Sequence, residues 1–158
     1  MLPLTFSETT MLIFFVSGAI FIADRLTKML TLQAKGKIEV LSDFVVFCLV
    51  RNEGLCFGLF SGQGSLIFWL TLLIIILIIG YVVIKKEKNR VFQIGIGLFL
   101  GGALGNLFDR AGEGVIDFIS IGIGDLRWPT FNIADIGICV GVVLILIRKR
   151  QETSSKTL

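Results

Sequence analysis

Polar side chains that can do acid–base chemistry lie inside or beside the apolar runs of this sequence. Four of them are carboxylates, and two asparagines and two cations accompany them. Two carboxylates that lie close together cannot both ionise at low cost, so such a pair holds one proton between them. The ionised member can then activate water while the protonated member donates to a leaving amine. The residues concerned are Asp24, Asp109, Asp117, Asp135, Asn106, Asn132, Lys28 and Arg110.

Histidine is absent from the sequence. Its absence excludes metallopeptidases of the HExxH type, hydrolases with a Ser-His-Asp triad and cysteine peptidases that depend on a histidine. An aspartate pair is therefore the simplest hydrolytic machinery that the chain could carry, and we expect no metal or other cofactor. The three cysteines show no C-x-x-C spacing: Cys139 is expected to pack in an apolar run, and whether Cys48 and Cys56 pair is left open.

Apolar runs make up most of the elements that must position these residues. Of the 158 residues, 54% are hydrophobic and 17% are charged, and the mean hydropathy is +0.89. Most charges lie between the runs, which is typical of membrane spans separated by loops. We predict a single membrane domain with four transmembrane helices, over residues 9–28, 66–84, 91–109 and 132–148. The first run has no basic residue before it and no A-x-A-like site after it, so we interpret it as a retained span.

Basic and strand-forming segments predict how these helices are oriented. The link at residues 85–90 and the segment 148–150 are basic, so the positive-inside rule places both segments and both chain termini in the cytoplasm. Residues 38–60 and 115–127 are rich in β-branched and aromatic residues, which predicts a small sheet on the outer membrane surface. Residues 151–158 are expected to be disordered. In this topology the carboxylates converge at the outer interface, and Asp135 faces a protein interior or a wet cavity.

Each polar group taken alone also has a structural explanation. Asp24 and Lys28 could form an i, i+4 pair at a helix end. Asn132 could be an N-cap, with Asp135 placed favourably at the positive end of a helix. The glycines of the third run favour close helix packing, because no phosphate-loop motif occurs. What favours a catalytic site is that all of these groups fall at one depth of the membrane.

Two further hypotheses for the whole chain stay open. In a small proton-coupled transporter, Asp135 would carry a proton through the membrane, but such proteins typically have inverted repeats and polar groups near the midplane. In a non-catalytic membrane scaffold, the glycine-rich third run would serve packing, which leaves the convergence of carboxylates without a reason. The modest net charge of +3 lies in clusters beside apolar runs, so we expect contact with lipid headgroups and no nucleic acid.

Five motifs, in order along most of the chain, resemble those of the bacterial lipoprotein signal peptidases, also called type II signal peptidases. Residues 24–28 resemble D-x-x-[ST]-K, and residues 52–54 resemble N-x-G. Residues 101–110 match GGxxGNxxDR, residues 115–118 match V-x-D-[FY], and residues 131–135 match F-N-x-A-D. Each motif alone is weak, whereas five in this order on four spans are highly specific.

The resemblance implies an aspartyl endopeptidase that cleaves prolipoproteins just before a cysteine that carries diacylglycerol. The catalytic aspartates of the family fall on Asp117 and Asp135, and Lys28 falls on a motif position to which we assign no role. The predicted sheet would be the family's β-cradle, which lies on the membrane and cups the substrate. The residues that fall on positions shaping the site or binding substrate are Asp24, Asn52, Gly54, Asn106, Asp109, Arg110 and Asn132.

The resemblance also implies where the protein acts and what it meets. We expect a monomer in the bacterial cytoplasmic (inner) membrane, with its active site at the extracytoplasmic face. Its partners would be diacylglyceryl-prolipoproteins and membrane lipids, and its inhibitor would be the cyclic peptide globomycin. One segment departs from the family, because Leu55-Cys56-Phe57 stands where small residues usually follow the N-x-G motif. This departure concerns the shape of the local pocket and leaves the aspartate pair intact.

Overall fold

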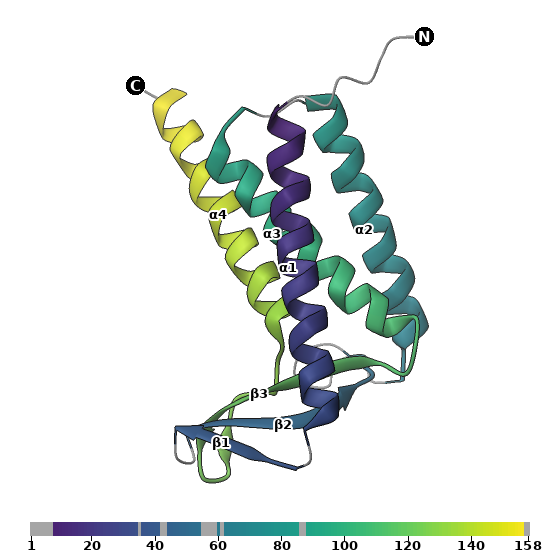
Figure 1. Cartoon of the computed structure of the whole chain (residues 1–158). Coiled ribbons are helices and arrows are strands. Elements are labelled where there is room, and N and C mark those ends of the chain that lie inside the picture. Colours follow the sequence, from purple (N-terminus) through teal and green to yellow (C-terminus); the bar gives the residue numbers. More distant parts are fainter. Residues whose placement is uncertain are drawn as a thin grey trace.

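The computed structural model describes residues 8–34, 36–41, 44–54, 60, 62–85 and 88–156. Within this part of the chain, four long helices form a bundle and a four-stranded sheet lies across one end of it (Figure 1). The start of the first helix and the end of the last lie at the opposite end (Figure 1). The elements are α1 (Glu8–Gln33), β1 (Ile38–Leu41), β2 (Val45–Asn52), α2 (Gly64–Lys85), α3 (Arg90–Arg110), β3 (Val115–Ile123), β4 (Leu126–Arg127) and α4 (Ile133–Lys156).

Helix α3 is the centre of the bundle and contacts the other three helices. Its first turn is fixed by Asn89, whose side chain accepts a hydrogen bond of 3.0 Å from the backbone N–H of Phe92. Its glycines let the neighbouring backbones come close. A Cβ atom on Gly101 would meet the carbonyl oxygen of Ser17 in α1, and one on Gly102 would meet the carbonyl oxygen of Ala134 in α4. Small residues at such crossings permit close packing where helices gain little from the hydrophobic effect.

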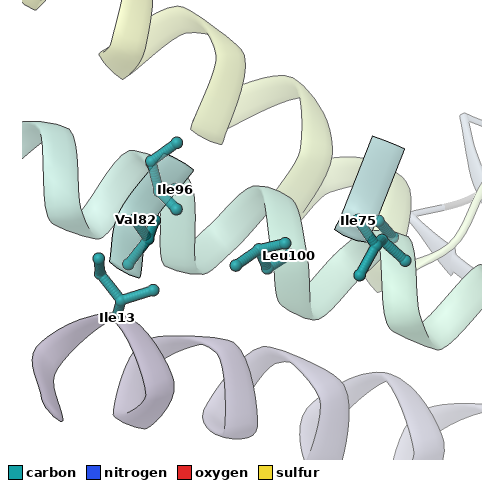
Figure 2. Close-up of a cluster of buried hydrophobic side chains, with 6 residues drawn as sticks. Ile13, Ile75, Val82, Ile96 and Leu100 are labelled. Atoms are coloured by element: carbon teal, nitrogen blue, oxygen red, sulfur yellow. The ribbon is translucent and has the colours of Figure 1, made fainter. Parts of the chain in front are cut away.

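A cluster of buried aliphatic side chains joins helices α1, α2 and α3 (Figure 2). Ile13 comes from α1, Ile75 and Val82 come from α2, and Ile96 and Leu100 come from α3. Helix α2 is held to the bundle mainly through this contact, since the contacts of α2 with other elements are chiefly with α3. The inner part of the bundle is therefore held by dispersion contacts between branched side chains.

The sheet is antiparallel, with strand order β1-β2-β3-β4. In its central pair, Val50 lies opposite Asp117 and Asn52 lies opposite Val115. Gly114 starts the return from α3 into β3 with φ of +99°, in the left-handed region that favours glycine. This turn brings β3 back under the end of α3. The predicted mostly helical fold with a small sheet is confirmed.

Among the described residues, three helices are long and apolar enough to cross a membrane: Thr10–Gln33, Gly64–Lys85 and Arg90–Arg110. Large apolar side chains such as Phe15, Trp69 and Leu77 are more than half exposed along these helices. Apolar surface of this extent is typical of a protein whose solvent is lipid. The uncharged stretch of α4, residues 136–147, is shorter than the roughly 20 residues that a span needs. The charged residues on both sides of this stretch, Asp135 and Arg148, distinguish α4 from the other three helices.

The end of the chain differs from the sequence prediction. Disorder was expected over residues 151–158, but α4 continues to Lys156. Residues 151–156 contain no glycine or proline, so nothing in the local sequence stops a helix that is already nucleated. Three segments of the sequence analysis lie partly outside the described residues. The strand region 38–60 lacks 42–43 and 55–59, which include Leu55-Cys56-Phe57, the basic link lacks 86–87, and the tail lacks 157–158. Cys48 is a free thiol.

The contact between Gly102 and Ala134 predicts a test of the helix packing. In the Gly102→Ala variant the new methyl group meets the Ala134 carbonyl oxygen, so α3 and α4 must separate. Overpacking of this kind costs about 1–3 kcal/mol, and we expect a lower thermal unfolding temperature in detergent. Gly80→Ala in α2 is the matched control, because a Cβ atom there meets nothing within 4 Å. An equal effect of the two substitutions would contradict this account of the α3–α4 contact.

Candidate active site

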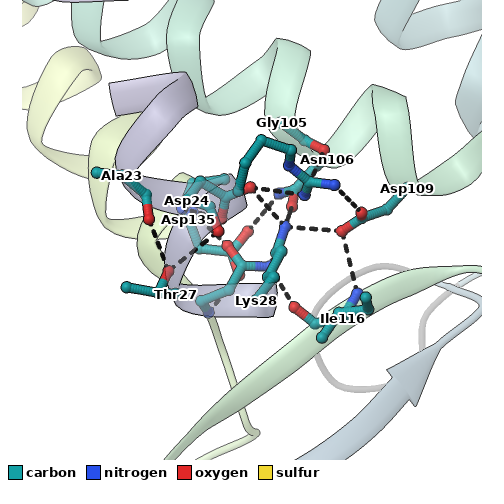
Figure 3. A network of polar contacts seen from close by, with 12 residues as sticks. Ala23, Asp24, Thr27, Lys28, Gly105, Asn106, Asp109, Ile116 and Asp135 are labelled. Carbon is teal, nitrogen blue, oxygen red and sulfur yellow. Dashed lines mark hydrogen bonds and ion pairs between the residues drawn. The ribbon is translucent and has the colours of Figure 1, made fainter. Parts of the chain in front are cut away.

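The polar residues singled out in the sequence lie together where the bundle meets the sheet (Figure 3). They come from the second half of α1, the last turns of α3, strands β2 and β3, and the first turn of α4. The structure brings together all nine of the expected site residues through an unbroken set of hydrogen bonds and ion pairs. Those residues are Asp24, Asn52, Gly54, Asn106, Asp109, Arg110, Asp117, Asn132 and Asp135.

Asn132 is the centre of this set and is fully buried. Its Nδ2 donates to Asp117 Oδ1 at 2.7 Å, to Asn106 Oδ1 at 3.0 Å and to the carbonyl oxygen of Ile116 at 3.2 Å. Its Oδ1 accepts from the backbone N–H of Asp135 at 2.9 Å, which makes Asn132 the N-cap of α4. One amide side chain therefore joins β3, α3 and α4.

Asp135 holds the other half of the same cap. Its Oδ2 accepts from the backbone N–H of Asn132 at 3.1 Å, which completes a reciprocal capping box. Its Oδ1 accepts from Asn106 Nδ2 at 2.7 Å. The side chain is only partly buried and reaches a cavity. The N-cap explanation of Asn132 and Asp135 is thus correct, and it is compatible with a chemical role for Asp135.

Asp117 is almost wholly buried on β3. Its Oδ2 accepts from Asn52 Nδ2 at 2.9 Å, across the β2–β3 pair. Burial raises the pKa of Asp117 to about 6, with a smaller contribution from the nearby negative charge of Asp135. The hydrogen bonds from Asn52 and Asn132 act in the opposite direction on this pKa, because they stabilise the carboxylate. Asp117 is therefore poised to exchange a proton near neutral pH.

Asn52 and Gly54 form the turn that follows β2. The backbone N–H of Gly54 donates to Asn52 Oδ1 at 2.9 Å, so the asparagine closes its own turn while its Nδ2 faces Asp117. Arg110 reaches the carbonyl oxygen of Gly54 with a hydrogen bond of 3.4 Å. These contacts bind the end of α3 to the end of β2 beside the aspartates.

A buried group of charges lies behind the aspartates (Figure 3). Lys28 Nζ is 2.8 Å from Asp24 Oδ2 and 2.7 Å from Asp109 Oδ2. Arg25 bridges the same two carboxylates at 2.8 and 2.7 Å and stacks over the ring of Phe108. Two cations thus balance two anions, which is the condition under which charges are tolerated in a low-dielectric interior.

The carboxylates of this group also hold backbone next to the other two aspartates. Asp24 Oδ1 accepts from the N–H of Ala134 at 3.1 Å, one residue before Asp135. Asp109 Oδ2 accepts from the N–H of Ile116 at 3.1 Å, one residue before Asp117. In each of these two contacts, a buried aspartate binds the backbone N–H of the residue that precedes Asp135 or Asp117.

A cavity of about 260 Å³ opens in front of the aspartates. Its polar wall includes both Asp117 and Asp135, and its apolar wall comes from α2, α3 and α4. Within the described residues, no group of three or more His, Cys, Asp or Glu side chains is arranged to hold a metal ion. The remaining lining residues are Asn52, Gly54, Thr71, Ile74, Phe99, Ala103, Asn106, Arg110, Val115, Thr130, Ile138 and Cys139.

Sequence reasoning missed two features of the site. Arg25 was not recognised as a partner of Asp24 and Asp109, although a second cation inside an apolar run is a visible signal. Cys139 was expected to be a packing residue, but it is exposed and lines the cavity one turn after Asp135. Its spacing of four residues from Asp135 could have placed both side chains on one helix face.

Comparisons with known proteins agree with the geometry. A sequence profile described as signal peptidase (SPase) II matches residues 16–149. A lipoprotein signal peptidase of Bacillus velezensis is 36% identical over 150 residues, which cover 92% of this chain and 98% of that protein. A lipoprotein signal peptidase of Staphylococcus aureus is 34% identical over 153 residues, which cover 90% and 94% of the two chains.

Solved structures give the same result. A structure described as a bacterial membrane enzyme at 2.3 Å resolution superposes with a TM-score of 0.81 at 34% identity, covering 90% of this chain and 89% of that one. A second, described in the same words at 1.9 Å resolution, gives 0.74 at 33% identity, covering 85% and 89%. The resemblance seen in the five motifs is confirmed: this chain belongs to the signal peptidase II family, whose members cleave the signal peptides of prolipoproteins.

Proposed function

We propose that this protein is an aspartyl endopeptidase that removes the signal peptide from diacylglyceryl-modified prolipoproteins, cleaving before the lipid-modified cysteine. Asp117 and Asp135 are the catalytic pair. The observation that carries the proposal is that both carboxylates line one cavity, at the end of an apolar bundle, and are joined through Asn132 and Asn106. A lipid-modified peptide would need such a cavity, in which carboxylates lie beside apolar walls.

The mechanism that we propose needs only water and the two carboxyl groups. A water molecule between Asp117 and Asp135 loses a proton to the ionised aspartate as its oxygen attacks the scissile carbonyl carbon. The protonated aspartate polarises the carbonyl oxygen and then protonates the leaving nitrogen as the C–N bond breaks. The pKa of Asp117, raised to about 6 by burial, supports this sharing of one proton between the two groups near neutral pH.

Other residues of the cavity would hold the substrate. Asn52 and Arg110 line the cavity beside Asp117, where they can position the peptide backbone or the lipid headgroup. Phe99, Ile74 and Ile138 offer an apolar surface for the acyl chains. Globomycin would inhibit by occupying the same cavity. The nine site residues meet within one chain, so the site as proposed needs no residue from a second copy.

We propose that all four helices cross the bacterial inner membrane, with the sheet outside and both termini in the cytoplasm. Helix α4 packs along α3, so its polar first turn can lie in the protein interior while its middle faces lipid. The basic ends, Lys85 of α2 and residues 148–150 of α4, lie at the end of the bundle away from the sheet (Figure 1). Their position agrees with the positive-inside rule.

Substitution of either aspartate tests the catalytic pair. We expect Asp117→Asn and Asp135→Asn each to lower kcat by about 10³-fold, because asparagine can neither take nor give the proton. The assay is cleavage of a diacylglyceryl-modified prolipoprotein by purified protein in detergent. Asp125→Asn, in the exposed turn between β3 and β4, is the matched control and should cleave like wild type. Full activity in either of the first two variants would rule out this mechanism.

The hydrogen bond from Asn52 predicts a shift in the pH dependence of cleavage. Asn52 Nδ2 stabilises ionised Asp117, so Asn52→Ala removes a contribution that lowers the pKa of Asp117. That pKa then rises above its wild-type value of about 6, and the limb of the pH–kcat/KM profile set by Asp117 moves to higher pH. A profile whose two limbs both stay in place would show that Asp117 does not titrate during catalysis.

Labelling of single cysteines tests the orientation. In a cysteine-free background, Lys88→Cys lies between α2 and α3, and Asp125→Cys lies in the sheet; both positions are exposed. With intact spheroplasts, we expect a membrane-impermeant maleimide to label the Asp125→Cys protein and not the Lys88→Cys protein. The Lys88→Cys protein should be labelled only after lysis. The reverse pattern would place the sheet in the cytoplasm.

A further inference from the structure

We infer that Lys28 is a positioning residue, whose buried ammonium group fixes the direction of the Asn106 side-chain amide so that Asn106 Nδ2 faces Asp135. This inference rests on the proposed function only for its effect on turnover. Lys28 does not line the cavity, so it acts on Asp135 through Asn106 and without contact with substrate.

The position of Lys28 is fully determined by its neighbours. Its side chain is 1% exposed, and its Nζ lies within hydrogen-bonding distance of three acceptors. Two are the carboxylates of Asp24 and Asp109, and the third is Asn106 Oδ1 at 3.2 Å. An ammonium group has three N–H bonds and no acceptor, so each of its hydrogens has one partner here. The two carboxylates hold Lys28 in place, and its third hydrogen is left for Asn106.

The direction of the Asn106 amide follows from what surrounds it. On one side lie Lys28 Nζ and Asn132 Nδ2, both of which only donate, and Asn106 Oδ1 accepts from both. On the other side lies Asp135 Oδ1, which accepts from Asn106 Nδ2 at 2.7 Å. A flipped amide would set its NH2 group against the ammonium and its oxygen against the carboxylate. The flipped form is therefore doubly unfavourable.

Asn132 shares this role with Lys28, since its Nδ2 lies 3.0 Å from Asn106 Oδ1, but it is a neutral donor with competing acceptors. Its Nδ2 group has two hydrogens but three acceptors, namely Asp117 Oδ1, Asn106 Oδ1 and the Ile116 carbonyl oxygen. The shortest of these contacts, at 2.7 Å, is with Asp117. Lys28 adds a charged donor, whose third hydrogen has Asn106 Oδ1 as its acceptor. We therefore expect the direction of the hydrogen bond from Asn106 to Asp135 to depend on Lys28, a residue in a different helix from either.

A double-mutant cycle on turnover tests the inference. The four proteins are wild type, Lys28→Met, Asn106→Ala and the double variant. We expect Lys28→Met to lower kcat by about 100-fold, since misplacement of a catalytic group by ~1 Å has this effect, with KM changed by less than about threefold. In the Asn106→Ala background, Lys28→Met should change kcat by less than about threefold. Effects that multiply would overturn the inference, because they would show that Lys28 acts through its charge alone.

Controls separate positioning from stability. Lys28→Met leaves Asp24 and Asp109 facing only one cation, so it is expected to unfold at a lower temperature. Val82→Ala, in the aliphatic cluster, provides a destabilised variant far from the site that should keep its kcat. If Lys28→Met does not fold, the same cycle is measured with Lys28→Gln, which leaves both carboxylates in place and offers them a neutral donor. The exposed Lys37→Met controls for loss of a lysine as such.

A measurement without substrate keeps the inference independent of the proposed function. Asparagine-selective ¹⁵N labelling reports the side-chain amide of Asn106 in the resting protein, with its signal assigned from the Asn106→Ala spectrum. We expect the amide hydrogen that faces Asp135 to exchange slowly with water in wild type and to lose this protection in Lys28→Met. Equal protection in both proteins would overturn the inference. Failure of wild type to cleave prolipoprotein would overturn only the proposed function.

Discussion

A lysine inside a helical bundle is stable only when anions surround it, and this requirement at Lys28 shapes the end of the bundle that meets the sheet. Asp24 from α1 and Asp109 from α3 both contact its ammonium group, and Arg25 completes the balance of charge. The same two carboxylates hold the backbone N–H groups of Ala134 and Ile116. The ion pairs of Lys28 thus hold the two carboxylates that bind the first turn of α4 and the start of β3.

Side chains that cap a helix or close a turn also form part of the proposed site. Asn132 and Asp135 close the first turn of α4 as a reciprocal cap, while their remaining polar atoms contact Asp117 and Asn106. A helix cap is a rigid part of a fold, so the side chains in it lose little further entropy when they are used for chemistry. Asn52 combines two tasks in the same way, because it closes its own turn and donates to Asp117.

Much of this arrangement could be predicted from the sequence. Apolar runs located the helices, and the β-branched segments located β2 and β3, because both patterns are local. The depth of each polar residue within its run indicated that Asp117, Asn132 and Asp135 would lie at one level. Two features were beyond local patterns: the pairing of Arg25 with Asp109 and the three-way contact of Lys28. Each depends on the rotation of one helix relative to another.

The end of the chain shows that local composition can also suggest disorder where a helix forms. The polar composition after Arg150 suggested disorder, but α4 continues to Lys156 because a preceding helix removes the cost of nucleation.

The glycines of α3 indicated close packing, and the structure adds a second reason for one of them. Gly105 faces the carboxylate of Asp24, and a hypothetical Cβ atom on Gly105 would lie 2.6 Å from Asp24 Oδ2. At that position the small residue makes room for a charge as well as for a backbone.

The sequence separation within the charged group has a consequence for biogenesis. Arg25 and Asp109 lie 84 residues apart, and Asp24 and Ala134 lie 110 residues apart. The segment 24–28 of α1 carries one net positive charge, and among the described residues the carboxylate from another helix that pairs with it is Asp109 of α3. The charge balance of this segment is therefore complete only with α3 in place, and the hydrogen bond from the Ala134 N–H to Asp24 needs α4 as well. A chain truncated before α3 would lack Asp109, and its segment 24–28 would keep one net positive charge.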